Sequence, residues 1–236
     1  MKLRTRVVTQ LAALCFVLGA YGFAANNAYL YIVNGIPGRD IADNLNPGFP
    51  MDILIDGECV ARGLSFGNTS GPLSFSAGTY SVQISEANTL AACTNAPLID
   101  SQVALTSGTS VSAVAAISGG QTSLLPFNDN LSAIKPGNAR FTFAAAADAP
   151  ALQATLTQLF VKHPKTFTVM ASAGLQQAIS VPDGTYLVQV LAAGSTAVLA
   201  SEQIGFADQS ATFTYAAGEA TNGSVGLINR TVRDVF

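Results

Sequence analysis

Four acidic residues lie close together in the first quarter of the sequence and are the best candidates for a binding feature. Asp52 and Asp56 flank a short apolar run, and Asp40 and Asp43 lie in the Gly- and Pro-rich segment before it. Carboxylates are ligands for Ca²⁺ and can act as a general acid and base. Asp56 is followed by a glycine, however, and Asp-Gly favours a hairpin turn. We therefore expect mainly turn and solvent-facing roles, with a loop binding feature as the alternative.

Nucleophilic and metal-dependent catalysis finds little support in the sequence. His163 is the only histidine, and it lies between lysines in a stretch that is typical of a solvated loop. A lone histidine does not build a multi-histidine zinc centre, and the Gly-x-Ser-x-Gly elbow of serine hydrolases is missing. We therefore expect no catalytic residue, no metal and no cofactor. A hydrolase that uses the carboxylates is the enzymatic alternative.

Two cysteines remain once the N-terminal segment with Cys15 is set aside. Cys59 and Cys93 are an even pair, as expected for a disulfide in an oxidising compartment. The bridge would stabilise the fold by about 3–4 kcal/mol in the chain-entropy model. The alternative is a two-cysteine metal or redox site, which would require closer spacing or a nearby histidine. The sequence therefore favours a structural Cys59–Cys93 disulfide.

The N-terminus has the pattern of a secretory signal peptide. Lys2, Arg4 and Arg6 precede a mostly apolar stretch, and Gly22 and Ala24 supply small side chains at positions −3 and −1 for cleavage near Ala24. The apolar stretch is short for a membrane anchor, which is the alternative. No later stretch has the length of a transmembrane helix. These features predict a periplasmic or extracellular protein whose mature part has no transmembrane segment.

Composition indicates a globular chain with few ionic groups on its surface. Apolar residues make up 49% of the 236 residues and charged residues only 11%. The net charge of −3, without a basic cluster beyond the N-terminus, argues against a nucleic-acid partner. Edge strands are normally protected from pairing by charged side chains. Because few charges are available here, we expect association with an envelope protein or with a second copy through sheet edges.

An internal repeat defines the organisation of the chain. Residues 73–84 (LSFSAGTYSVQI) return as residues 179–190 (ISVPDGTYLVQV), each with a Gly-Thr-Tyr turn followed by an alternating strand. Short β-rich runs and frequent turns surround both copies, which predicts an all-β chain of two tandem antiparallel β-sandwiches. The predicted boundaries are a signal peptide at 1–24, a first repeat at 25–120, a linker at 121–138 and a second repeat at 139–236. Residues 151–161 fit a helix or a strand, and the repeat favours a strand.

Several motifs resemble one bacterial family of secreted proteins. They are Ala-Arg-x-x-x at 139–143, Asp-Ala-Pro-Ala at 148–151, the Asp-x-x-x-Asp-Gly hairpin at 52–57, Ala-Gly-Thr-Tyr-x-Val at 77–82 and the join at 129–140. Together they resemble the domain of unknown function numbered 4397, in two copies. The resemblance implies an exported immunoglobulin-like or transthyretin-like sandwich at the cell envelope, without an established activity. The family's first strand often runs into a His-Ala pair, which this chain lacks.

The favoured function is a non-catalytic envelope module that binds or assembles through loops or sheet edges. Four features of the sequence support this hypothesis: the duplicated β unit, the export signal, the low charge and the lack of a recognisable set of catalytic residues. A small-ligand or carbohydrate carrier is the second hypothesis, using the loop at 35–50 and the groove between the repeats. Four tyrosines are expected to pack in the core or across strands and not to form a sugar-stacking platform: Tyr29, Tyr31, Tyr80 and Tyr186.

Overall fold

The computed structural model describes residues 27–38, 48–149 and 151–235. The predicted signal peptide lies outside these ranges, as do Asp40 and Asp43. Within the described parts of the chain, no helix has the length and apolar character needed to cross a bilayer.

The described chain consists of sixteen β-strands in four sheets of four strands each. The strands are β1 (Asn27–Asn34), β2 (Met51–Ile55), β3 (Glu58–Leu64), β4 (Thr69–Ser76), β5 (Gly78–Glu86), β6 (Ile99–Leu105), β7 (Ser110–Ser118), β8 (Gln121–Asn128), β9 (Asn138–Ala145), β10 (Ala151–Gln158), β11 (Thr166–Ser172), β12 (Gln176–Pro182), β13 (Gly184–Ala192), β14 (Val198–Phe206), β15 (Ala211–Ala217) and β16 (Gly226–Val232).

The two halves of the chain have the same topology. In the first unit, sheet β4-β1-β7-β8 faces sheet β3-β2-β5-β6, and in the second unit β12-β9-β15-β16 faces β11-β10-β13-β14. Each strand of the first unit thus has its counterpart eight strands later. All pairs are antiparallel except β1–β7 and β9–β15, which are parallel. The prediction of an all-β chain in two sandwich units is confirmed.

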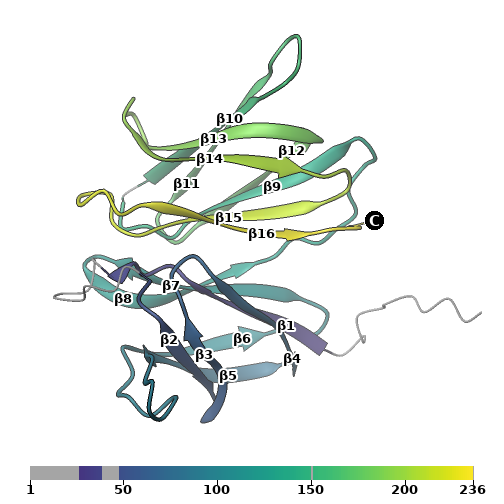
Figure 1. Cartoon of the computed structure of the whole chain (residues 1–236). Coiled ribbons are helices and arrows are strands. Elements are labelled where there is room, and N and C mark those ends of the chain that lie inside the picture. Colours follow the sequence, from purple (N-terminus) through teal and green to yellow (C-terminus); the bar gives the residue numbers. More distant parts are fainter. Residues whose placement is uncertain (1–26, 39–47, 150, 236) are drawn as a thin grey trace, which may run out of the picture.

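The two sandwiches stack into four layers (Figure 1). Two apolar clusters fill the interiors of the units, one around Leu30 and Ile53 and the other around Phe141 and Val188. A third cluster, which includes Val114 and Phe213, joins the facing sheets of the two units. The two inner sheets are therefore covered on both faces, and their central strands β7 and β15 are buried almost throughout.

The repeated Gly-Thr-Tyr motif has the same role in both units. The hydroxyl group of Tyr80 donates to the carbonyl of Ser76, and that of Tyr186 donates to the carbonyl of Pro182, each over 2.9 Å. Both tyrosines thereby fix the tight connection that leads into β5 or β13. Their rings pack against Phe75 in the first unit and against Phe167 in the second. The prediction that these two tyrosines are structural is confirmed.

One predicted boundary is wrong. The sequence predicts a linker over residues 121–138, but residues 121–128 form β8, which pairs with β7 along its whole length. Pro126 suggested a break, yet β8 is an edge strand, where a proline is tolerated because its missing N–H faces away from the ladder. The first unit therefore extends to Asn128. The strand favoured for residues 151–161 is confirmed as β10, which ends at Gln158.

Candidate functional site

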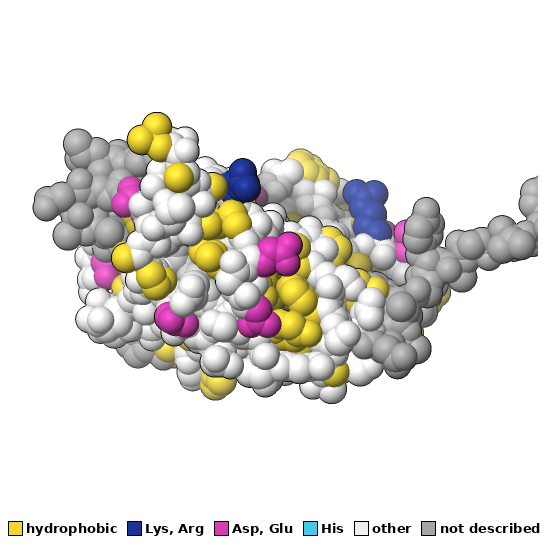
Figure 2. Space-filling view, turned by 90° about the horizontal axis from the view of Figure 1, so that it is seen from below, with side chains coloured by type: hydrophobic (Ala, Val, Ile, Leu, Met, Phe, Trp, Pro, Cys, Tyr) yellow, Lys and Arg dark blue, Asp and Glu magenta, His cyan; other side chains and the backbone are white. Residues whose placement is uncertain are grey.

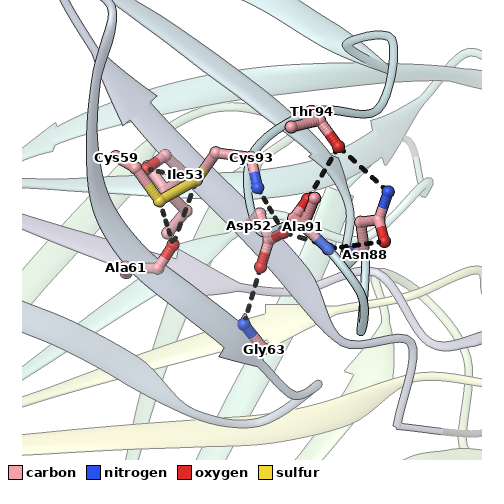
Figure 3. Close-up of a disulfide and its surroundings, with 9 residues drawn as sticks. All are labelled: Asp52, Ile53, Cys59, Ala61, Gly63, Asn88, Ala91, Cys93 and Thr94. Atoms are coloured by element: carbon pink, nitrogen blue, oxygen red, sulfur yellow. Dashed lines mark hydrogen bonds between the residues drawn. A yellow bond between two sulfur atoms is a disulfide. The ribbon is translucent and has the colours of Figure 1, made fainter.

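Asp52 organises one end of the outer sheet of the first unit (Figure 3). Its carboxylate accepts backbone N–H groups from Gly63 at 2.9 Å, Asn88 at 3.1 Å and Cys93 at 2.7 Å. Asp52 points away from the sandwich core, but it is only 1% exposed because the loop between β5 and β6 folds over it. We call residues 87–98 the Cys93 loop. The carboxylate thus joins β2, the end of β3 and this loop.

The hydrogen bonds also determine the charge state of Asp52. Desolvation by burial acts to raise the pKa of the carboxyl group, but the three N–H groups and the positive charge of Arg62 outweigh it. The pKa of Asp52 is therefore lower than its ordinary value. The side chain is a stable anion whose oxygens are engaged by the backbone, which makes it an anchor for the loop.

The disulfide holds the Cys93 loop at a second point. Cys59 on β3 is bonded to Cys93, with the two Cα atoms 5.9 Å apart. The predicted disulfide is therefore present. Asn88 orders the inside of the loop: its carbonyl oxygen accepts the N–H groups of Leu90 and Ala91, and its amide donates to Thr94. The second unit has only a short turn between β13 and β14, so this braced loop is specific to the first unit.

Removing the disulfide should loosen this loop while leaving both sandwiches folded. We expect Cys59→Ala/Cys93→Ala to lower the free energy of unfolding by about 3 kcal/mol, since the bridge joins positions 34 residues apart. Denaturant titration would measure the loss, and limited proteolysis should show new cleavage within residues 87–98. Unchanged proteolysis of the loop would show that Asp52 alone is enough to fix it.

The braced loop presents an apolar tip beside a hollow. Leu90 is 97% exposed. The hollow has a volume of about 410 Å³ and is lined by residues of β2, β3 and the loop, among them Asp52, Arg62, Asn88 and Leu90. Figure 2 looks onto this side of the first unit, where uncharged polar groups predominate and isolated acidic and basic side chains lie among apolar ones. The arrangement suits recognition of a surface with mixed polar and apolar character.

Two other candidates, Asp56 and His163, do not join Asp52. Asp56 lies at the opposite end of β2, in the predicted Asp-Gly turn with φ angles of 48° and 81°, and accepts the N–H of Ser81 at 2.8 Å. His163 is exposed in the hairpin between β10 and β11, in the other unit. In the part of the chain that the structure describes, no group of three or more His, Cys, Asp or Glu residues could hold a metal ion.

A second polar centre, which the sequence analysis missed, lies between the two units. Arg230 of β16 forms an ion pair with Asp129 at 2.6 Å, and their side chains are 9% and 0% exposed. Asp129 also accepts the hydroxyl groups of Ser110 at 2.6 Å and Ser112 at 2.9 Å. These hydroxyl groups add to the stabilisation of the buried carboxylate, whereas Nε and Nη1 of Arg230 have no hydrogen-bond partner among the described residues. The pair connects the second unit to β7 and the end of β8.

Aromatic rings enclose the guanidinium group of Arg230. Its central carbon lies 3.9 Å from the ring centroid of Tyr31, in the first unit, and 4.5 Å from that of Phe213, in the second. Neighbouring Tyr215 is buried, and this burial, together with the negative charge of Asp129, raises its pKa to about 12. The contacts of this centre indicate a role in joining the units.

The family motif at residues 148–151 contributes another contact between the units. The carboxylate of Asp148 accepts the N–H groups of Gly119 at 3.1 Å and Gly120 at 3.0 Å. These glycines have φ angles of 60° and 72° and form the tight turn between β7 and β8. The paired N–H groups of such a turn form a concave site for an anion. The motif thus fixes one unit to the preceding one.

A second hollow lies where the chain leaves the first unit. It has a volume of about 530 Å³, and hydroxyl and amide side chains line much of it: Thr106, Thr109, Ser110, Asn128, Asn130 and Ser132. Asp129 contributes to its wall but is already engaged by Arg230. The lining could hydrogen-bond an uncharged polar molecule.

Comparison with protein-family models places the chain in a known family. The family model described as "Domain of unknown function (DUF4397)" matches residues 28–155, more than half of the sequence. The chain belongs to this family. The match covers the first unit, β9 and most of β10, so the family model does not itself define a second copy, although the two units share one topology. No curated protein matches the DUF4397 chain.

Solved structures match the chain at low similarity. The Bacillus anthracis TIE protein has 10% identity and a TM-score of 0.26. The match covers 87% of this chain but only about a third (34%) of the length of that protein. A protein of Bacteroides ovatus described as a "putative cell adhesion protein" has 8% identity and a TM-score of 0.29; the match covers 90% of this chain and 98% of that protein. A Bacteroides uniformis protein of the same description has 9% identity and a TM-score of 0.28; the match covers 88% of this chain and 98% of that protein.

Proposed function

We propose that this DUF4397 protein is a non-catalytic module of the cell envelope that binds a partner through its Cys93 loop. The supporting observation is that a disulfide and a buried carboxylate both fix this one loop, while its tip exposes Leu90 almost completely. Holding a loop in its binding conformation reduces the entropy lost on association. An apolar side chain on a fixed loop is suited to fill a pocket in a partner.

The proposal includes export to a periplasmic or extracellular location. A structural disulfide is typical of oxidising compartments. Two of the carboxylates singled out in the sequence serve the fold: Asp52 binds the backbone of the loop, and Asp56 binds the N–H of Ser81. The proposed role therefore assigns Asp52 to positioning a binding loop and Asp56 to a turn, and neither to acid–base chemistry.

Site-specific cross-linking on intact cells would test the proposed function. With a photoreactive residue at position 90, we expect a discrete adduct with one envelope component. The same residue at Gln102, an exposed position on β6, is the control and should give no such adduct. Leu90→Asp should weaken binding of the identified component by about tenfold or more, as for other central apolar contacts. Equal labelling from both positions, or turnover of a substrate by the purified protein, would overturn the proposal.

A small-ligand carrier is the second candidate, and the polar hollow near Asn130 favours it. Its hydroxyl and amide groups match the hydrogen-bonding needs of an uncharged sugar. A thermal-shift screen with neutral saccharides would test this role. A ligand should raise the melting temperature of the native protein, and Asn130→Leu should remove that rise. A screen without a stabilising sugar would count against the carrier.

A further inference from the structure

The outer edge of β11 differs from the other sheet edges of the described chain. Each of the other seven edge strands contains a charged residue or a proline, the features that protect edges from pairing. They are Glu58 and Arg62 in β3, Pro72 in β4, Asp100 in β6, Pro126 in β8, Pro182 in β12, Glu202 in β14 and Arg230 in β16. β11 has neither, and residues 166–182 contain no charged side chain.

The corresponding edge of the first unit is irregular. There β3 pairs with β2 through two register shifts, and its Cys59 is tied to the Cys93 loop. β11 pairs with β10 over seven consecutive residues without a shift. Bulges and covering loops hinder the addition of another strand, whereas a regular edge strand presents its unpaired N–H and carbonyl groups for pairing. Within one molecule, the first unit thus has a protected version of this edge and the second unit an open one.

Exposed apolar side chains concentrate along the same side. Of the seven large apolar residues exposed in the described part of the chain, four lie at β11 or its two ends. Phe160 and Val161 are in the hairpin before β11, which projects at the top of Figure 1; Met170 is within the strand, and Leu175 follows it. Such a concentration in a protein with few surface charges indicates an interaction surface.

The free backbone groups of β11 can be assigned from its ladder. The N–H of Gln158 donates to the carbonyl of Lys165 at 2.9 Å. Because hydrogen-bonded positions alternate in an antiparallel pair, residues 167, 169 and 171 bond to β10. The N–H and carbonyl groups of Thr166, Thr168 and Met170 therefore point to the open edge, as does the N–H of Ser172, whose carbonyl accepts the N–H of Leu175 at 2.9 Å. These are also the residues whose side chains are exposed.

We propose that β11 pairs with β11 of a second copy in an antiparallel, two-fold arrangement centred on Val169. This register places Thr168 opposite Met170 of the second copy, so the free backbone groups meet and the apolar inner faces continue across the sheet. The two Lys165 side chains lie at opposite ends of the paired β11 strands, so they do not repel each other. The Leu175 end of each copy adjoins the Phe160 end of the other. This self-complementarity favours a second copy over an unrelated strand.

The inference deepens the proposed function, because it names one partner of the envelope module. The outer sheets of two second units join into one sheet of eight strands. The Cys93 loops belong to the first units, so they stay free to bind other molecules. A two-fold dimer would then present two such loops, and two linked sites bind a multivalent surface more tightly than one.

Sedimentation velocity of the purified protein over a range of concentrations tests the interface. We expect a monomer–dimer equilibrium. Thr168→Lys should raise the dissociation constant of the dimer by about tenfold or more, since each cross-strand pair occurs twice in the dimer. Met170→Glu should act in the same way. Thr168→Lys/Met170→Glu should restore the dimer, because the introduced lysine of each copy then faces the introduced glutamate of the other. Gln102→Lys on the edge strand β6 is the matched control and should leave the equilibrium unchanged.

A monomer at all concentrations would overturn the proposal. So would a dimer that resists Thr168→Lys, or a double variant that stays dissociated. Circular dichroism of each variant confirms that both units remain folded. These outcomes do not depend on the cross-linking at Leu90, so the β11 interface can fail while the binding role of the Cys93 loop stands.

Discussion

Replacing Arg230 by methionine is expected to lower the free energy of unfolding by about 3–5 kcal/mol. The methionine keeps much of the apolar packing between Tyr31 and Phe213, but it leaves the carboxylate of Asp129 buried without its counter-charge. Denaturant titration of the purified protein measures the loss. We expect an early transition in which the units separate, followed by unfolding of each sandwich.

Two controls distinguish the buried charge from the loss of side-chain volume. Arg230→Met/Asp129→Asn should recover most of the stability, because the asparagine can still bond to Ser110 and Ser112 without an unpaired charge. Arg233→Met, at an exposed position near the C-terminus, should have no comparable effect. If Arg230→Met behaves like Arg233→Met, the ion pair does not hold the units together.

Tyrosine ionisation gives an independent readout of the same interface. Burial raises the pKa of Tyr215 to about 12, so its phenol stays protonated well above the ordinary value near 10. Where Arg230→Met separates the units, Tyr215 becomes hydrated and should ionise at lower pH. Ultraviolet titration of the phenolate would detect that shift.

Local patterns in the sequence predicted much of each unit. The Gly-Thr-Tyr repeat implied two equivalent sandwiches, and the two copies occupy β4–β5 and β12–β13. Asp56 with Gly57 predicted a hairpin turn, because both central positions of a type I′ turn require positive φ. The disulfide followed from the even pair of cysteines beyond the N-terminal segment. Each of these features depends on residues that are close in sequence or on a simple count.

The contacts between the units could not be predicted in this way. Arg230 and Ser112 are 118 residues apart and bond only because two sheets of different units stack face to face. Strand alternation shows which residues face the core of a unit, but it does not show that the other face meets a second unit. The uniform burial of β15, with Thr212 and Thr214 inside, results from that stacking.

The role of Asp52 was missed for a related reason. The sequence predicts mainly turn and solvent-facing roles for the acidic residues, yet Asp52 is buried and its partners are three backbone N–H groups. Backbone groups leave no mark in the sequence. The glycine at position 63, with φ of 61°, is the one local hint, since it turns its N–H toward the carboxylate. Asp40 and Asp43 stay a prediction, because they lie outside the described residues.

Replacing Asp52 by asparagine should destabilise the protein by about 3 kcal/mol at neutral pH. An asparagine has a single acceptor oxygen, and its amide group would face at least one of the N–H donors of Gly63, Asn88 and Cys93. Denaturant titration should measure the loss, and proteolysis should show a loosened Cys93 loop. Asp56→Asn is the matched control and should give a smaller change, because Asp56 is exposed and accepts one N–H group.

The pH dependence of this loss identifies its cause. The folded pKa of Asp52 lies below the ordinary value of about 3.9, so its stabilising effect is complete above that value and disappears as the pH falls through the folded pKa. The stability of the native protein should therefore drop more steeply below about pH 4 than that of Asp52→Asn, and the two curves should converge in acid. A constant difference down to low pH would mean that the asparagine disturbs packing, and that the negative charge is not what holds the Cys93 loop.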